Sequence, residues 1–142
     1  MKESVGILII AKSTNNFLLL HRSGSPIVWS VLSGKMDIEG ESPIDTIKRE
    51  ISEEININPK LIKNIKEVGI IRDNKIFHVF VGFVDNEFTP NLKLDENDDF
   101  GWYNENNLPS PIHKKWDKTF QLVKSSLSLR ETIINQLNKF YL

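Results

Sequence analysis

The sequence contains no cysteine, carries almost no net charge and has no apolar run long enough to cross a bilayer. Without cysteine, disulfides, thiolate catalysis and cysteine-ligated zinc sites are excluded. Its 18 basic and 19 acidic residues give a net charge of −1, so we expect no broad positive surface for nucleic acid or an anionic membrane. The apolar run over residues 5–11 is too short to span a bilayer, and no signal-peptide cleavage site follows it. We therefore expect a cytoplasmic protein with neither a membrane nor a stable nucleic-acid partner.

What the sequence does contain is enough apolar residues for a single domain over residues 1–142. A chain of this length can bury about two thirds of its extended surface, so a true core is expected. Segments rich in β-branched and apolar residues predict strands. These segments, separated by turn-forming residues, are 5–11, 17–22, 29–32, 65–72, 76–84 and 100–103.

One helix is predicted between Ser42 and Asn56. Ser42 is a good N-cap, Pro43 suits the first helical position, and Asp45 complements the helix dipole. Asn56 tolerates the left-handed conformation of a C-cap. An apolar stripe at three- and four-residue steps is formed by Ile44, Ile47, Ile51 and Ile55. This face is therefore expected to pack on the core.

Two further helices are predicted near the C-terminus. The first is expected to follow Ser110-Pro111 and to bury Trp116, Phe120, Val123 and Leu127. A capping box of Ser128 and Glu131 is expected to start the second, with a stripe of Leu129, Ile133, Leu137 and Phe140. The acidic segment 95–99 is expected to be a loop. Helices packed on a mixed sheet give an α+β or α/β sandwich.

The chemistry is concentrated on the acidic edge of the helix predicted over 42–56. Glu50 and Glu54 are four residues apart and share a face, and Glu53 lies beside them. Like charges at this spacing repel by a few tenths of a kcal/mol, and a bound cation would remove that repulsion. Carboxylate oxygens suit Mg²⁺, which is often shared with substrate phosphates. Taken alone, three glutamates also fit an ordinary solvated helix face.

The whole string from Gly34 to Ile57 resembles the Nudix box. In that motif a Gly is followed by a Glu, an Arg-Glu pair, an apolar residue, a Glu-Glu pair, a Gly and an apolar residue. The charged and apolar matches, which keep the family's spacing among themselves, are Glu41, Arg49, Glu50, Ile51, Glu53, Glu54 and Ile57. The differences are one extra residue before Glu41, Asn56 in place of the closing Gly, and Leu32-Ser33-Gly34 where the family often has Pro-Gly-Gly. They fall outside the charged face.

The resemblance implies a Nudix-type α/β/α sandwich around a mixed sheet. It also implies Mg²⁺-dependent hydrolysis, with Mn²⁺ able to substitute, of a diphosphate linkage in a nucleoside diphosphate joined to another group. On this resemblance Glu50 and Glu54 are the main metal ligands and Glu53 is a further ligand or the base. Arg49 would hold the glutamates in place, and Glu41 would be a supporting acid.

Further candidates lie outside the box. Glu96 precedes Trp102 at a spacing that several family members use for one more acid, so it is a second candidate for the base. The alternative is that Glu96 is an ordinary solvated acid in a run with Asp95, Asp98 and Asp99. If Glu96 acts as the base, we expect this loop to fold over the metal and to be mobile without ligand. Arg22 and Arg72 are candidates for binding substrate phosphate, and Gly34 is a candidate for lining the substrate site.

Two functions are compatible with these residues. The first is a hydrolase, whose compact chain favours nucleoside triphosphates or dinucleoside polyphosphates, with ADP-ribose or nucleotide sugars as the alternative. The second is a non-catalytic module that senses a nucleotide, for which loss of a metal-site glutamate would be expected. Because Glu50, Glu53 and Glu54 are all present, the hydrolase is favoured. We expect it to act as a monomer or homodimer.

Overall fold

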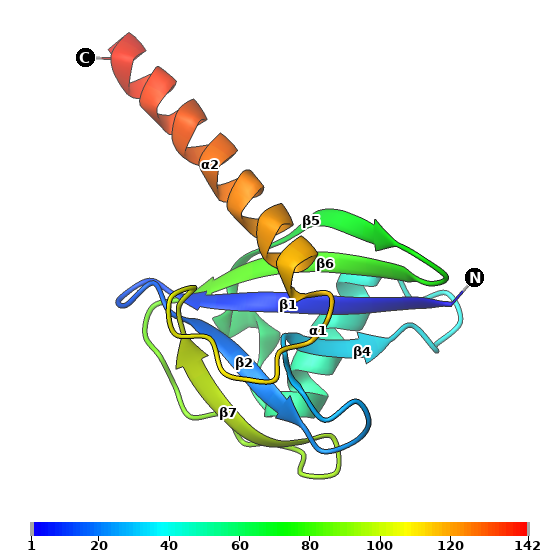
Figure 1. Ribbon diagram of the computed structural model, residues 1–142. Helices are drawn as coiled ribbons and strands as arrows, with labels where there is room; N and C mark the ends of the chain where they lie inside the picture. Colours follow the sequence, from blue (N-terminus) through cyan, green and yellow to red (C-terminus); the bar gives the residue numbers. More distant parts are fainter. Residues whose placement is uncertain (1, 142) are drawn as a thin grey trace.

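A mixed seven-stranded sheet forms the centre of the computed structural model, which describes residues 2–141 (Figure 1). The path through the sheet is β3-β2-β1-β6-β5, with β4 paired to β1 and β7 paired to β2. Strands β1 and β6 are parallel, and every other pairing is antiparallel. The strands are β1 Glu3–Ala11, β2 Phe17–Arg22, β3 Trp29–Ser30, β4 Leu32–Lys35, β5 Lys63–Arg72, β6 Ile76–Val84 and β7 Asn97–Tyr103. The mixed sheet predicted from the sequence is confirmed.

Strand β1 is buried on both faces, as its uninterrupted apolar sequence predicts. Its odd-numbered residues from Val5 to Ala11 belong to the core beneath helix α1. Leu8 and Ile10 belong to a second core on the opposite face, which contains Trp116 and Val123 of helix α2. The two helices therefore cover opposite faces of the sheet.

Helix α1 (Pro43–Ile55) has the caps and the buried stripe predicted for it. The Ser42 hydroxyl accepts a hydrogen bond from the Asp45 backbone N–H at 3.2 Å, and Asn56 adopts the left-handed conformation with φ 53°. Ile47, Ile51 and Ile55 are fully buried against the sheet. A short 3-10 helix, η1 (Pro59–Leu61), follows and leads into β5. The orientation of α1 is thus determined by its apolar stripe, which leaves its acidic edge at the side.

The prediction of two C-terminal helices is wrong, because α2 is one continuous helix over Trp116–Tyr141. Neither glycine nor proline interrupts the segment around Ser128 and Glu131, so the helix continues through the residues expected to restart it. The C-terminal part of α2 projects past the sheet (Figure 1). The expected second stripe is accordingly exposed at Leu129, Ile133 and Leu137, and the Phe140 side chain lies outside the described part of the chain.

The segment before α2 also differs from the prediction that a helix starts at Ser110-Pro111. The Pro111 carbonyl accepts a hydrogen bond from the Trp29 backbone N–H at 2.9 Å, and the His113 N–H donates to the Trp29 carbonyl at 2.9 Å. These bonds hold residues 111–113 extended beside β3, so α2 begins only at Trp116. No helix within residues 2–141 is both long enough and apolar enough to cross a membrane.

Four of the predicted strands have different bounds in the structure, and β1 and β5 each begin two residues earlier than predicted. The other two differences concern the site. The segment expected to end as a strand at Leu32 continues as β4 through Gly34, which pairs with Val5 of β1. The acidic segment 95–99 is only partly a loop, because β7 begins at Asn97 and pairs with β2. This earlier start of β7 brings the acidic segment close to α1.

Candidate active site

The centre of the candidate site is a buried pair of glutamates on α1, Glu50 and Glu54, called here the carboxylate pair. Each has only 6% of its surface exposed, although both belong to a residue type that is rarely buried without a partner. Gly34 of β4 lies directly against Glu50, and a Cβ atom at that position would collide with the glutamate side chain. Glycine at this place therefore lets β4 pass close to α1 and leaves room for the carboxylate.

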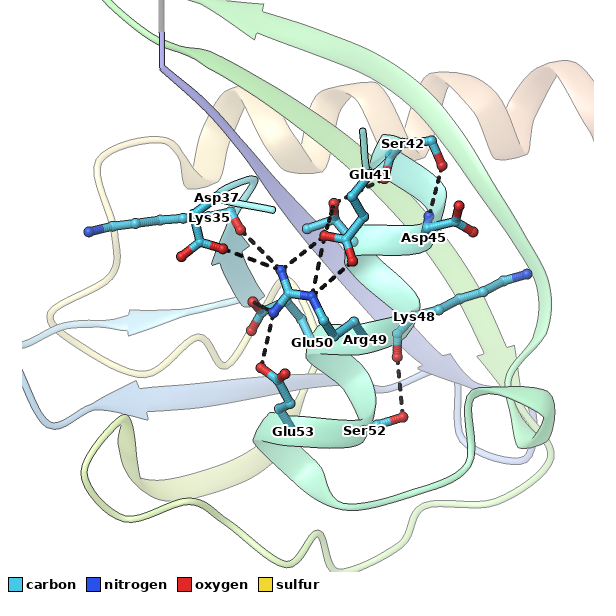
Figure 2. Close-up of polar contacts among 11 residues, drawn as sticks. Lys35, Asp37, Glu41, Ser42, Asp45, Lys48, Arg49, Glu50, Ser52 and Glu53 are labelled. Atoms are coloured by element: carbon cyan, nitrogen blue, oxygen red, sulfur yellow. Dashed lines mark hydrogen bonds and ion pairs between the residues drawn. The ribbon is translucent and has the colours of Figure 1, made fainter. Parts of the chain in front are cut away.

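Arg49 is the hub of an ion-pair cluster at the same edge of α1 (Figure 2). Its guanidinium donates two bonds of 3.0 Å to the Glu41 carboxylate, from Nε and from Nη2. Nη1 donates to Glu50 Oε1 and to Glu53 Oε2, each at 3.1 Å. The Thr46 hydroxyl donates to Glu41 Oε1 at 2.8 Å. One arginine thus orients three of the four box glutamates.

This hub changes the acid–base properties of its members. Hydrogen bonds from Arg49 and then from Thr46 hold the pKa of Glu41 below its usual value. The pKa of Arg49 is raised, first by its bonds to Glu41, so the cation is permanent. Glu41 and Arg49 therefore form a charged support that stays ionised at the pH at which an enzyme works.

The carboxylate pair has the opposite character. Burial raises the pKa of Glu50, and the neighbouring Arg49 charge partly offsets that rise. Burial raises the pKa of Glu54 to about 7, and repulsion from Glu96 and then Glu50 adds to the effect. Among the described residues Glu54 forms no ion pair like that of Glu50 with Arg49, and the charge of Lys93 offsets only part of the rise. A divalent cation bound to both carboxylates would supply the missing positive charge.

Glu96 lies in a turn over residues 91–97, called here the Glu96 turn, that is attached to the C-terminal end of α1. Backbone N–H groups of Lys93 and Asn91 donate to the last carbonyls of α1, those of Glu54 and Ile55, at 3.3 and 3.4 Å. The N–H of Ser23, the residue after β2, donates to the Glu96 carbonyl at 3.0 Å. The Ser23 hydroxyl donates to the Leu94 carbonyl at 2.8 Å. The turn is therefore hydrogen-bonded both to α1 and to the residue that follows β2.

Asn97 is a residue of this site that the sequence did not identify. It is 9% exposed, and its Nδ2 donates to Glu54 Oε2 at 2.9 Å. The sequence around Asn97, an acidic run, does not indicate this role. The Asn97–Glu54 contact spans 43 positions and depends on the register of β7 against β2.

The two candidate phosphate ligands occupy different places. Arg22, at the end of β2, pairs in the sheet with Asn97 of β7, the residue whose amide bonds to Glu54. Its buried Nε has no hydrogen-bond partner among residues 2–141. Arg72 instead lines a groove with Gln121 and Leu122 of α2, on the sheet face opposite α1. Arg22 is therefore a sheet neighbour of the residue that contacts Glu54, whereas Arg72 lies beside α2.

Comparison with known proteins decides the family. The NUDIX domain profile matches residues 1–123, which include all of α1 and β7. The chain belongs to the Nudix hydrolase family. As a Nudix hydrolase it acts on phosphoanhydride bonds. Among curated proteins, no sequence matches this Nudix chain.

Solved Nudix structures share the fold at low sequence identity. An Ap4A hydrolase from C. elegans, in a binary complex, is 21% identical with a TM-score of 0.73, over 90% of this chain and 98% of its own. A MutT NUDIX hydrolase from Burkholderia pseudomallei is 21% identical with a TM-score of 0.68, over 86% and 97%. The NUDIX domain of Shewanella oneidensis NrtR, complexed with ADP ribose, is 17% identical with a TM-score of 0.72, over 88% and 87%. At these identities the likeness confirms the mixed sheet with helices, that is, the Nudix fold.

Proposed function

We propose that this Nudix hydrolase is a Mg²⁺-dependent pyrophosphohydrolase that cleaves a diphosphate linkage in a nucleotide-like substrate. The observation that carries the proposal is the carboxylate pair, buried at one edge of α1 and flanked by a permanent cation on one side only. We infer further that the substrate is a nucleoside triphosphate or a dinucleoside polyphosphate. An Ap4A hydrolase of this fold supports that class by the dinucleoside polyphosphate in its name.

The donor set fits the proposed cation. Glu50 and Glu54 offer carboxylate oxygens, which suit a hard divalent ion. Glu53 lies about one turn from Arg49 on the same helix edge, and 46% of its side chain is exposed. No group of three or more His, Cys, Asp or Glu side chains within residues 2–141 forms a ready-made metal site. The protein would thus contribute few ligands, and phosphate oxygens of the substrate would complete the coordination, as is usual for Mg²⁺.

When bound there, Mg²⁺ would neutralise phosphate charge and increase the acidity of a nearby water. The chain's own residues would do the rest. Arg49 keeps Glu50 and Glu53 oriented, and Arg22 has a buried, unpaired Nε with which to hold a phosphate oxygen. Glu96 and Glu53 are the two candidates to take the proton from the attacking water. Of these, Glu53 already has one carboxylate oxygen bonded to Arg49, so we favour Glu96.

The experiment is a substrate panel in ¹⁸O-labelled water. The panel contains deoxynucleoside triphosphates, a diadenosine polyphosphate, ADP-ribose and a nucleotide sugar, each with Mg²⁺, with Mn²⁺ and with a chelator. We expect turnover that needs the metal, and mass spectrometry of the products would show which phosphorus was attacked. Turnover that is equal in the chelator, or none with any diphosphate, would refute the proposal. Preference for ADP-ribose or the sugar would refute only the substrate class.

A further inference from the structure

The two glutamates of the carboxylate pair are held by different kinds of donor. Glu50 Oε1 accepts from the Arg49 guanidinium at 3.1 Å, whereas Glu54 Oε2 accepts from the Asn97 amide at 2.9 Å. The Glu54–Asn97 bond joins two buried side chains, so water does not compete for it. A hydrogen bond to a carboxylate in such surroundings is among the stronger ones in proteins. Glu54 therefore has a defined orientation without an ion pair.

The backbone around Asn97 makes its amide a fixed donor. Asn97 pairs with Arg22 across β2 and β7, and its own N–H donates to the Lys93 carbonyl at 3.0 Å. The Lys93 N–H in turn donates to the Glu54 carbonyl at 3.3 Å. Helix α1, the Glu96 turn and β7 are thus linked in a closed set of bonds, in which Asn97 supplies the side-chain link.

A neutral donor suits a carboxylate that has to bind a metal. An arginine or lysine at position 97 would orient Glu54 equally well, but its charge would repel a divalent cation. The amide of Asn97 orients the carboxylate and leaves its full negative charge available. Without Asn97, Glu54 would be free to rotate toward Lys93, the nearby cation that already attracts it.

We propose that Asn97 is a positioning residue for the hydrolysis, which acts by fixing Glu54 in its metal-binding orientation. The proposal rests on the proposed function, because it requires that Glu54 is a ligand of the divalent cation. Removing a residue that hydrogen-bonds to a metal ligand commonly lowers metal affinity by about 10- to 100-fold. We expect a loss of this size for Mn²⁺ when the Asn97 amide is removed.

The test measures Mn²⁺ binding to the whole chain by electron paramagnetic resonance, independently of activity. Asn97→Leu keeps the approximate shape of the side chain and removes the donor, and Asn97→Ala removes both. Asn91→Ala is the matched control, because Asn91 is an exposed residue of the same turn that bonds to α1 through its backbone. Circular dichroism and thermal melting identify which variants are folded.

The expected result is Mn²⁺ affinity reduced by about 10- to 100-fold in a folded Asn97 variant and unchanged in Asn91→Ala. A folded Asn97→Leu or Asn97→Ala protein that binds Mn²⁺ like the wild type would overturn the inference. Glu54→Gln separates this outcome from failure of the proposed function. If Glu54→Gln also binds Mn²⁺ normally, the metal assignment itself is wrong.

Discussion

Replacing Glu54 by glutamine should increase stability and abolish most activity, and the size of the first effect follows from the structure. Burial, with repulsion from Glu96 and Glu50, raises the pKa of Glu54 from 4.5 to about 7. A shift of this size sets an upper limit of about 3 kcal/mol on the destabilisation caused by ionising Glu54. Screening at the solvent-facing edge of the site reduces the expected value to roughly 1–2 kcal/mol. Glutamine removes the charge, and its carbonyl can still accept the Asn97 hydrogen bond.

The sign of the pH dependence follows from proton linkage. Because the folded pKa lies above the unfolded one, the folded state binds more protons between pH 4.5 and about 7, and wild-type stability falls as pH rises through that window. The stability advantage of Glu54→Gln is therefore complete above about pH 7 and disappears below about pH 4. In metal-free buffer near pH 8, we expect the variant to melt roughly 3–6 °C higher.

Differential scanning calorimetry at several pH values, with a chelator, measures this effect. Activity with Mg²⁺ should fall by at least about a hundredfold, as for loss of a metal ligand. Glu105→Gln is the control, because this exposed glutamate makes one surface ion pair, with Lys124, and should change neither quantity. A lower melting temperature for folded Glu54→Gln at pH 8, or wild-type turnover, would refute the reasoning.

Three further predictions concern the rest of the site. Crystals soaked with Mn²⁺ and a nucleotide analogue should show metal density about 2.0–2.3 Å from the oxygens of the carboxylate pair, and density only at a distant place would contradict the assignment. Glu96→Gln should lower kcat more than it changes KM. Asp98→Asn should be nearly neutral, and equal losses of kcat in the two variants would refute a specific role for Glu96. Arg22→Ala should raise KM about 10-fold or more, as expected for a lost hydrogen bond to a charged group, whereas Arg72→Ala should leave steady-state kinetics unchanged. Equal effects of the two arginine changes would show that Arg22 acts only through general charge.

The sequence by itself determined the features of α1 that depend on neighbours within about one turn. The N-cap at Ser42, the left-handed C-cap at Asn56 and the buried isoleucine stripe follow from local propensity and periodicity. Two site contacts follow in the same way. Glu50 and Glu54 share a face, and Arg49 reaches Glu53 at four residues' spacing, because helical geometry brings such residues together.

Only the tertiary structure decided what meets α1 at its acidic edge. Arg22 pairs in the sheet with Asn97, the residue that contacts Glu54, whereas Arg72 lies beside α2. The same pairing carries Asn97 to Glu54, across 43 positions of sequence. Strand register is set by packing between distant segments, and a shift of one residue would turn every side chain to the other face. No local pattern in an acidic run could therefore have shown that its one asparagine faces the buried glutamate.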